Sequence, residues 1–196
     1  MSELKSICVF CGSSEGNDEA IIQEAQLLGQ TMARRQIALV YGAAHIGVMG
    51  VLAEGALQEK GHVIGVIPEF LKKKEVVHLG LPELITTENM HQRKMKMHDL
   101  SDGFIALPGG MGTLEELFEI LTWLQLGLHA KPIGLLNTSN FFDPLLEQLE
   151  LMVKKGFLKY DNYALLLVDE TIEGLLDKMG GFKRPEVPKW LNPDRT

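Results

Sequence analysis

The sequence predicts an α/β fold: a three-layer, Rossmann-like parallel sheet with helices on both faces, in a single domain. Short apolar runs alternate with helical patterns along the whole chain, as in sheets whose parallel strands are joined by helices. The apolar runs are also continuous rather than alternating with polar residues, which is typical of strands buried on both faces. A chain of 196 residues, 45% of them hydrophobic, is large enough for one such core.

The first half of the chain contains four expected strands and three expected helices. The segment QIALVY, for example, is continuously apolar and is closed by Gly42, and the preceding helical pattern repeats apolar residues at three- and four-residue spacing. A polar loop with three consecutive lysines is interpreted as a solvated surface. We expect strands at residues 7–11, 36–41, 62–67 and 84–87, helices at 18–35, 47–60 and 90–101, and the loop around Lys72, Lys73 and Lys74.

The second half continues the alternation. A helix begins at Thr113, after a glycine-rich turn, and its apolar stripe faces the core. Further strands are expected at residues 104–107, 132–136 and 165–168, with helices at 141–155 and 172–179. The single domain therefore covers residues 1–181, and the tail, residues 182–196, contains three prolines and is expected to be extended or weakly ordered.

Charge and composition exclude several function classes. A net charge of −7 argues against nucleic acid or an anionic membrane as the main partner. No apolar window approaches the roughly 18 residues of a membrane span, so we expect a cytoplasmic protein. Cys8 and Cys11 lie in a predicted strand, where residues three apart point to opposite faces. They are interpreted as reduced core thiols, and no metal site is expected.

The turn PGGMGT, residues 108–113, joins a buried strand to a helix and predicts an anion site. A helix N-terminus leaves backbone N–H groups unpaired, and glycines let a phosphate approach the main chain. The G-x-x-x-x-G-K-[ST] pattern of a P-loop is absent from the chain, and Glu115 stands where the dinucleotide fingerprint needs its third glycine. A mononucleotide phosphate therefore suits this turn better, at the sheet edge it shares with residues 12–14 and 42–50.

Two alternatives remain open for the charged residues near this turn. Thr113 and Glu116 have the spacing of a capping box, so Glu116 either caps the helix or acts on a ligand. Arg93 and Lys94 share a helix face with two methionines, so they either line a half-buried cleft or extend to solvent. His91 and His98 lie on a neighbouring face and are interpreted as surface or supporting residues, not as metal ligands.

The pair MHQRK, residues 90–94, and PGGMGTLEE, residues 108–116, resembles the LOG ("lonely guy") family of cytokinin riboside 5′-monophosphate phosphoribohydrolases. The similarity extends through CVFCGS, HVIGVIP and TWLQLGLHAKPIGLL. The resemblance implies hydrolysis of the N-glycosidic bond of purine nucleoside 5′-monophosphates, including AMP, to a free base and ribose 5-phosphate. It assigns catalysis to Arg93 and Glu116, and it implies a homodimer. It gives no support to the "lysine decarboxylase" label that many members carry.

On this interpretation the substrate is anchored by residues around the turn, and no cofactor is needed. An oxocarbenium-like ribose would be stabilised by Glu116, as in glycoside hydrolysis. The expected substrate contacts are Ser13, Met90, Lys94, Gly109, Gly110, Gly112 and Thr113.

Two features qualify the resemblance. Ala43 and Ala44 stand where family members typically have glycines, which restricts positive φ and casts doubt on ligand contacts there. A non-catalytic nucleotide- or molybdenum-cofactor-binding carrier of the same fold is the alternative function, and it would not need Glu116. An apolar surface at residues 123–128 is a candidate subunit contact.

Overall fold

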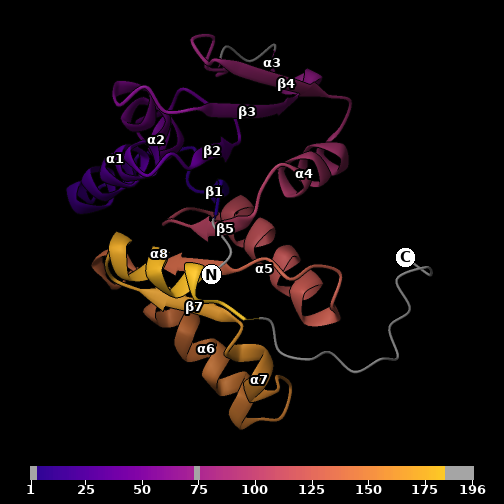
Figure 1. Ribbon diagram of the computed structural model, residues 1–196. Coiled ribbons are helices and arrows are strands. Elements are labelled where there is room, and N and C mark those ends of the chain that lie inside the picture. The colour runs from indigo at the N-terminus through magenta and orange to yellow at the C-terminus, as the bar shows by residue number, and fades with distance from the viewer. Residues whose placement is uncertain (1–3, 73–75, 184–196) are drawn as a thin grey trace.

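A computed structural model describes residues 4–72 and 76–183 and confirms the parallel sheet (Figure 1). Seven strands lie in the order β4-β3-β2-β1-β5-β6-β7, and every pairing between neighbours is parallel. The strands are β1 (Ser6–Phe10), β2 (Ala38–Tyr41), β3 (Val63–Pro68), β4 (Glu83–Thr87), β5 (Gly103–Ala106), β6 (Ile133–Leu136) and β7 (Leu166–Asp169).

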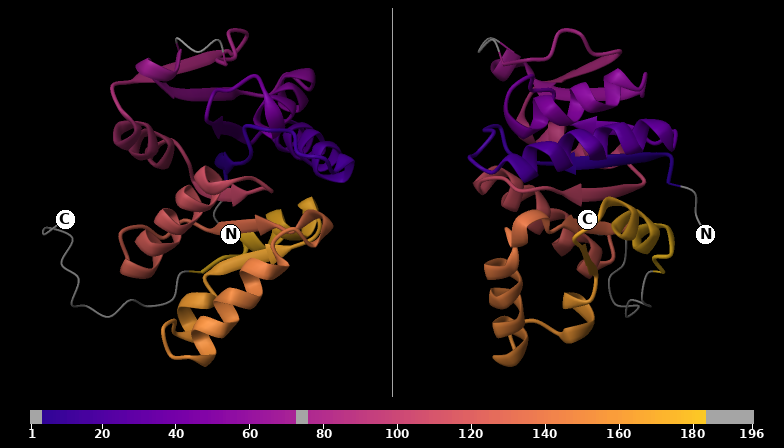
Figure 2. Two further views of the ribbon diagram at one scale, coloured as in Figure 1. Left: turned by 180° about the vertical axis from the view of Figure 1, so that it is seen from behind. Right: turned by 90° about the vertical axis from the view of Figure 1, so that its left-hand side faces the viewer.

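Helices cover both faces of this sheet, as the rotated views show (Figure 2). Buried side chains of α1, α2 and α8 form one core cluster, and those of α4, α5 and α6 contribute to the other. The helices are α1 (Glu19–Arg34), α2 (Gly47–Gln58), α3 (Glu69–Lys72), α4 (Met90–Asp99), α5 (Met111–Leu126), α6 (Asp143–Lys154), α7 (Tyr160–Tyr163) and α8 (Ile172–Gly180).

The two cysteines show how the sheet separates the core into two layers. Cys8 belongs to the cluster beneath α4 and α5, and Cys11 to the cluster beneath α1 and α2. Both thiols are free and buried, and burial raises their pKa values, so they stay protonated at neutral pH. This confirms the interpretation as core thiols.

Element boundaries differ from the sequence prediction by a few residues. Strand β2 begins at Ala38 because Gln36 has a positive φ of 59° and Ile37 still donates its N–H to Met32 O. The short helices α3 and α7 were not predicted. Lys73, Lys74 and residues 184–196 of the expected tail lie outside the described residues. In the described ranges, no helix is long and apolar enough to cross a bilayer.

The strand order reverses at β1, whose neighbours are β2 and β5. At such a switch point the loops that follow the two central strands diverge and leave a crevice. Here the loops stay tied together, because Gly12 N donates to Pro108 O at 3.2 Å and Met49 N donates to Gly12 O at 3.2 Å. The turns after β1 and β5 and the start of α2 therefore surround one site.

Candidate active site

A cleft of about 490 Å³ opens at this edge of the sheet. Its walls come from the loops after β1, β2 and β5, from α4, and from the first turns of α5. Seven of the nine residues predicted from sequence line it: Ser13, Met90, Arg93, Gly110, Gly112, Thr113 and Glu116. Gly109 instead lines an adjoining cavity of about 390 Å³, which meets the cleft at Gly12, Ser13 and Gly110.

Helix α5 begins at Met111, two residues before the predicted start. The first N–H groups of a helix have no intrahelical acceptor. Here Gly110 is the N-cap, and no side chain caps these groups. Thr113 is the third helical residue, and its side chain is buried. The capping-box interpretation of Thr113 and Glu116 is therefore wrong, because Gly110 itself occupies the cap position.

The two glycines of the turn have different steric surroundings, and this gives a first prediction. A Cβ on Gly109 would overlap Thr113 Oγ1 and lie 2.8 Å from Gly12 N, whereas a Cβ on Gly110 meets nothing within 4 Å. Gly109→Ala should lower the melting temperature by several degrees, because the two loops would have to separate. Gly110→Ala should fold normally and weaken nucleotide monophosphate binding about tenfold, since its methyl group faces the cleft. Thermal unfolding and calorimetry of both variants test this contrast.

Arg93 is fixed at the ends of two strands. The N-terminus of α4 is capped by Asn89, whose side chain accepts from Gln92 N at 2.9 Å, and this sets the helix start. The partly buried guanidinium then donates from Nε to Val66 O at 3.1 Å and from Nη2 to Gly42 O at 3.4 Å. The alternative in which Arg93 extends to solvent is wrong, and its cation lines the cleft.

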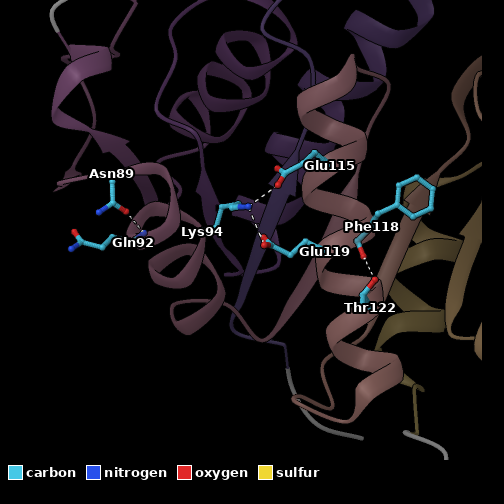
Figure 3. A network of polar contacts seen from close by, with 7 residues as sticks. All are labelled: Asn89, Gln92, Lys94, Glu115, Phe118, Glu119 and Thr122. Carbon is cyan, nitrogen blue, oxygen red and sulfur yellow. Dashed lines mark hydrogen bonds and ion pairs between the residues drawn. The ribbon is translucent and has the colours of Figure 1, made fainter. Parts of the chain in front are cut away.

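Lys94 lies between α4 and α5 (Figure 3), and it is not among the residues that line the cleft. Its Nζ donates to Glu115 Oε1 at 2.6 Å and to Glu119 Oε1 at 3.0 Å. Burial alone would lower the pKa of Lys94, but the hydrogen bonds to these carboxylates outweigh it and raise the pKa. Lys94 thus holds the two helices together, and the structure does not place it at the predicted substrate contact.

Glu116 lines the cleft one turn after the uncapped end of α5 and is partly buried. Burial raises the pKa of Glu116 to about 7. The charges of Arg93 and Lys94 lower this pKa, whereas those of Glu115 and Glu119 raise it. A carboxyl group that titrates near neutral pH in a cleft is a candidate acid or base. The site therefore combines a helix-end anion site, a fixed cation and a proton-exchanging carboxyl group.

Comparisons with known proteins identify the family. A Rhodococcoides fascians protein named cytokinin riboside 5′-monophosphate phosphoribohydrolase is 47% identical over 173 residues, 88% of this chain and 87% of that protein. Arabidopsis thaliana LOG1, of the same name, is 47% identical over 178 residues, 91% and 84% of the two chains. The family described as "Possible lysine decarboxylase" matches residues 49–179. The chain belongs to the LOG family.

Solved structures with the same fold include proteins with a different named function. The molybdenum cofactor binding protein of Rippkaea orientalis has a TM-score of 0.69 at 25% identity, over 92% of this chain and 98% of that one. A Moco carrier protein from Chlamydomonas reinhardtii has a TM-score of 0.66 at 22% identity, over 90% and 95% of the two chains, which shows the shared fold.

Of the two alanines that depart from the LOG pattern, Ala43 has a backbone conformation usual for glycine. Ala43 is fully buried with a φ of 63°, and its carbonyl oxygen accepts from His78 N at 2.8 Å. Ala44 pairs with Val77 in an isolated bridge and lines the cleft. The added methyl group of Ala44 therefore narrows the cleft, whereas that of Ala43 lies in the core.

Two parts of the site were missed by sequence reasoning. One part is an apolar wall of the cleft, formed by Ile46, Met49, Leu71 and Val76. Leu71 and Val76 flank the lysine run, which was interpreted only as solvated surface. The sequence left open whether His98 is a surface or a supporting residue; its ring packs against Phe104 and Trp123, with ring centroids 5.8 and 5.5 Å apart. Among the described residues, no group of three His, Cys, Asp or Glu side chains is arranged to hold a metal ion.

Proposed function

We propose that the protein hydrolyses the N-glycosidic bond of purine nucleoside 5′-monophosphates, including AMP and cytokinin ribotides, giving the free base and ribose 5-phosphate. The observation that carries this proposal is Glu116, a carboxyl group with a pKa of about 7 in the same cleft as an uncapped helix N-terminus. The names of relatives at 41–47% identity support a phosphoribohydrolase and not a lysine decarboxylase.

The 5′-phosphate binds at the start of α5. The N–H groups of Gly112 and Thr113 point out of the helix end, whose partial positive charge favours an anion. Gly110 leaves this approach open, because it has no side chain and lies against open space. Ser13, exposed on the neighbouring loop, supplies a hydroxyl donor from the other side.

The ribose then lies beside Glu116. As the C1′–N bond breaks, positive charge develops on the ribose, and the ionised carboxylate stabilises it. A water oxygen bonds to C1′ while one of its protons passes to Glu116, and the base leaves with the bonding electrons and takes up a proton from solvent, to which Glu116 later returns its own. Arg93 keeps Glu116 partly ionised and contributes positive charge for the phosphate side of the substrate.

The base occupies the apolar side of the cleft. Met90 at the start of α4 and the wall of Ile46, Met49, Leu71 and Val76 offer apolar contacts to a flat ring and its substituents. The homodimer and the cytoplasmic location stay predictions. Exposed apolar side chains on α5 and after it, Phe118, Leu126 and Leu128, are consistent with a subunit contact there.

Base release separates this function from its alternative. A nucleotide or molybdenum-cofactor carrier is the second candidate, favoured by the likeness to the Rippkaea orientalis protein. Purified protein is incubated with AMP and with an N6-prenylated adenine ribotide, and the products are separated by chromatography. Release of adenine or its N6-substituted form supports the hydrolase. Tight binding with both nucleotides recovered intact would support the carrier instead.

A further inference from the structure

A small cavity adjoins the cleft and shares Phe10 and Glu116 with it. It lies between α4, α5 and the strands β1 and β5, and its volume is about 10 Å³. A space of this size is about that needed for a single water molecule, provided that polar groups line it. Four of its lining residues are ionisable, and the full lining is Phe10, Lys94, His98, Phe104, Glu116, Glu119 and Ile120.

His98 presents a buried nitrogen in this region. Its side chain is 15% exposed, and its ring stacks on Phe104 at 5.8 Å and 17° and meets Trp123 edge-on. Nδ1 lies 3.3 Å from Asp99 Oδ1, so in the neutral ring the proton is on Nδ1 and Nε2 is an acceptor. Within the described residues, the buried Nε2 has no hydrogen-bond partner. Such an atom is costly unless water satisfies it.

We propose that one water molecule in this cavity links His98 Nε2 to the Glu116 carboxylate and makes His98 a positioning residue for the reaction. The inference rests on the proposed function of Glu116. The water donates one hydrogen to Nε2 and the other to the carboxylate. The water also accepts a hydrogen bond from Lys94 Nζ. The ammonium group has three protons, and its bonds to Glu115 and Glu119 use two of them.

This arrangement favours the ionised form of Glu116, because a hydrogen bond is donated to the charged carboxylate. Several other charged or titratable groups also face the two linked side chains. Around Glu116 they are Arg93, Lys94, Glu115, Glu119, Cys8 and Cys11, and around His98 they are Asp99, Lys131 and His129. All of them remain in a His98 variant, so a change in the titration of Glu116 reports on the link itself.

The test replaces His98 by Phe, which keeps the aromatic packing and removes Nε2. The acidic limb of kcat/KM should move upward by about 0.5–1 pH unit, and kcat at pH 7 should fall about twofold to fivefold with KM little changed. His98→Gln, whose amide can approach the position of Nε2, should restore most of the wild-type profile. His91→Gln, on the exposed side of the same helix, is the matched control and should leave the profile unmoved.

A second readout does not depend on turnover. The pKa of Glu116, measured by NMR on protein with a ¹³C-labelled glutamate carboxyl, should rise by the same amount in His98→Phe and return in His98→Gln. If wild type releases no base, the proposed function fails while this measurement still decides the link. An unmoved Glu116 pKa in His98→Phe overturns the inference. So does an equal loss of melting temperature in both His98 variants with no change in pKa, which would mark His98 as merely structural.

Discussion

Glu116→Gln should lower kcat for base release by about 10³-fold or more while leaving nucleotide binding within a few-fold of wild type. Glutamine keeps the shape of the side chain but has no negative charge for the ribose cation and accepts no proton from water. The proposed phosphate contacts at Gly112 and Thr113 do not involve this side chain. Chromatography of the released base measures the first effect, and calorimetry with AMP measures the second.

The same substitution should also stabilise the protein at alkaline pH. Glu116 has a pKa of about 7 in the folded protein and 4.5 as its reference value, so the unfolded chain loses this proton first as pH rises. Stability therefore falls by about 3 kcal/mol between these two pH values, and Glu116→Gln does not undergo this loss. Its melting temperature should exceed that of wild type at pH 8 and match it near pH 4.

Glu115→Gln is the control for Glu116→Gln, because it replaces the neighbouring glutamate by glutamine in the same way. It removes the ion pair between Glu115 and Lys94. We expect less than about a tenfold loss of kcat there, because Lys94 keeps its ion pair with Glu119. Wild-type turnover by Glu116→Gln would contradict the catalytic assignment of this carboxyl group.

Arg93→Ala should lower kcat/KM by about 10²–10³-fold and destabilise the fold by about 2 kcal/mol. The variant leaves Val66 O and Gly42 O without the donors that hold them at 3.1 and 3.4 Å, and it removes the cation that lowers the pKa of Glu116. The pKa of Glu116 should therefore rise further, and the acidic limb of activity should move upward with it. Steady-state kinetics across pH and thermal unfolding measure the two effects.

Lys96→Ala removes an exposed cation from the same helix and should change neither quantity appreciably. Gly42→Ala gives an independent check, because its Cβ would overlap Arg93 Nη2 and displace the guanidinium without removing its charge. Full activity in Arg93→Ala would show that the cation is not part of the reaction.

The fold was predictable because its signals are local and repeated. Continuous apolar segments such as β1 and β5 mark buried parallel strands, and their position in the chain brings the turns after them to one edge. The four-residue helices α3 and α7 were missed because they are too short to show a helical period.

Site residues that lie within one sequence motif could be predicted. Contacts between residues of elements far apart in the sequence could not. Glu116 and Arg93 lie in motifs with recognisable neighbours, and both line the cleft. The partners of Lys94 are set by how α4 packs on α5, which spacing within α4 does not reveal. The position of His98 stayed open between surface and support for the same reason, since Phe104 and Trp123 come from two other elements.

The central claim is that the cleft cleaves a purine nucleoside 5′-monophosphate and does not only bind it. The most direct measurement is a product balance for wild-type protein with AMP, in which adenine and ribose 5-phosphate are quantified together, and with adenosine, which lacks the phosphate. The account predicts equal amounts of the two products from AMP and almost none from adenosine, because the phosphate anchors the substrate at the start of α5. AMP that binds and is recovered intact, or equal cleavage of adenosine, would contradict it.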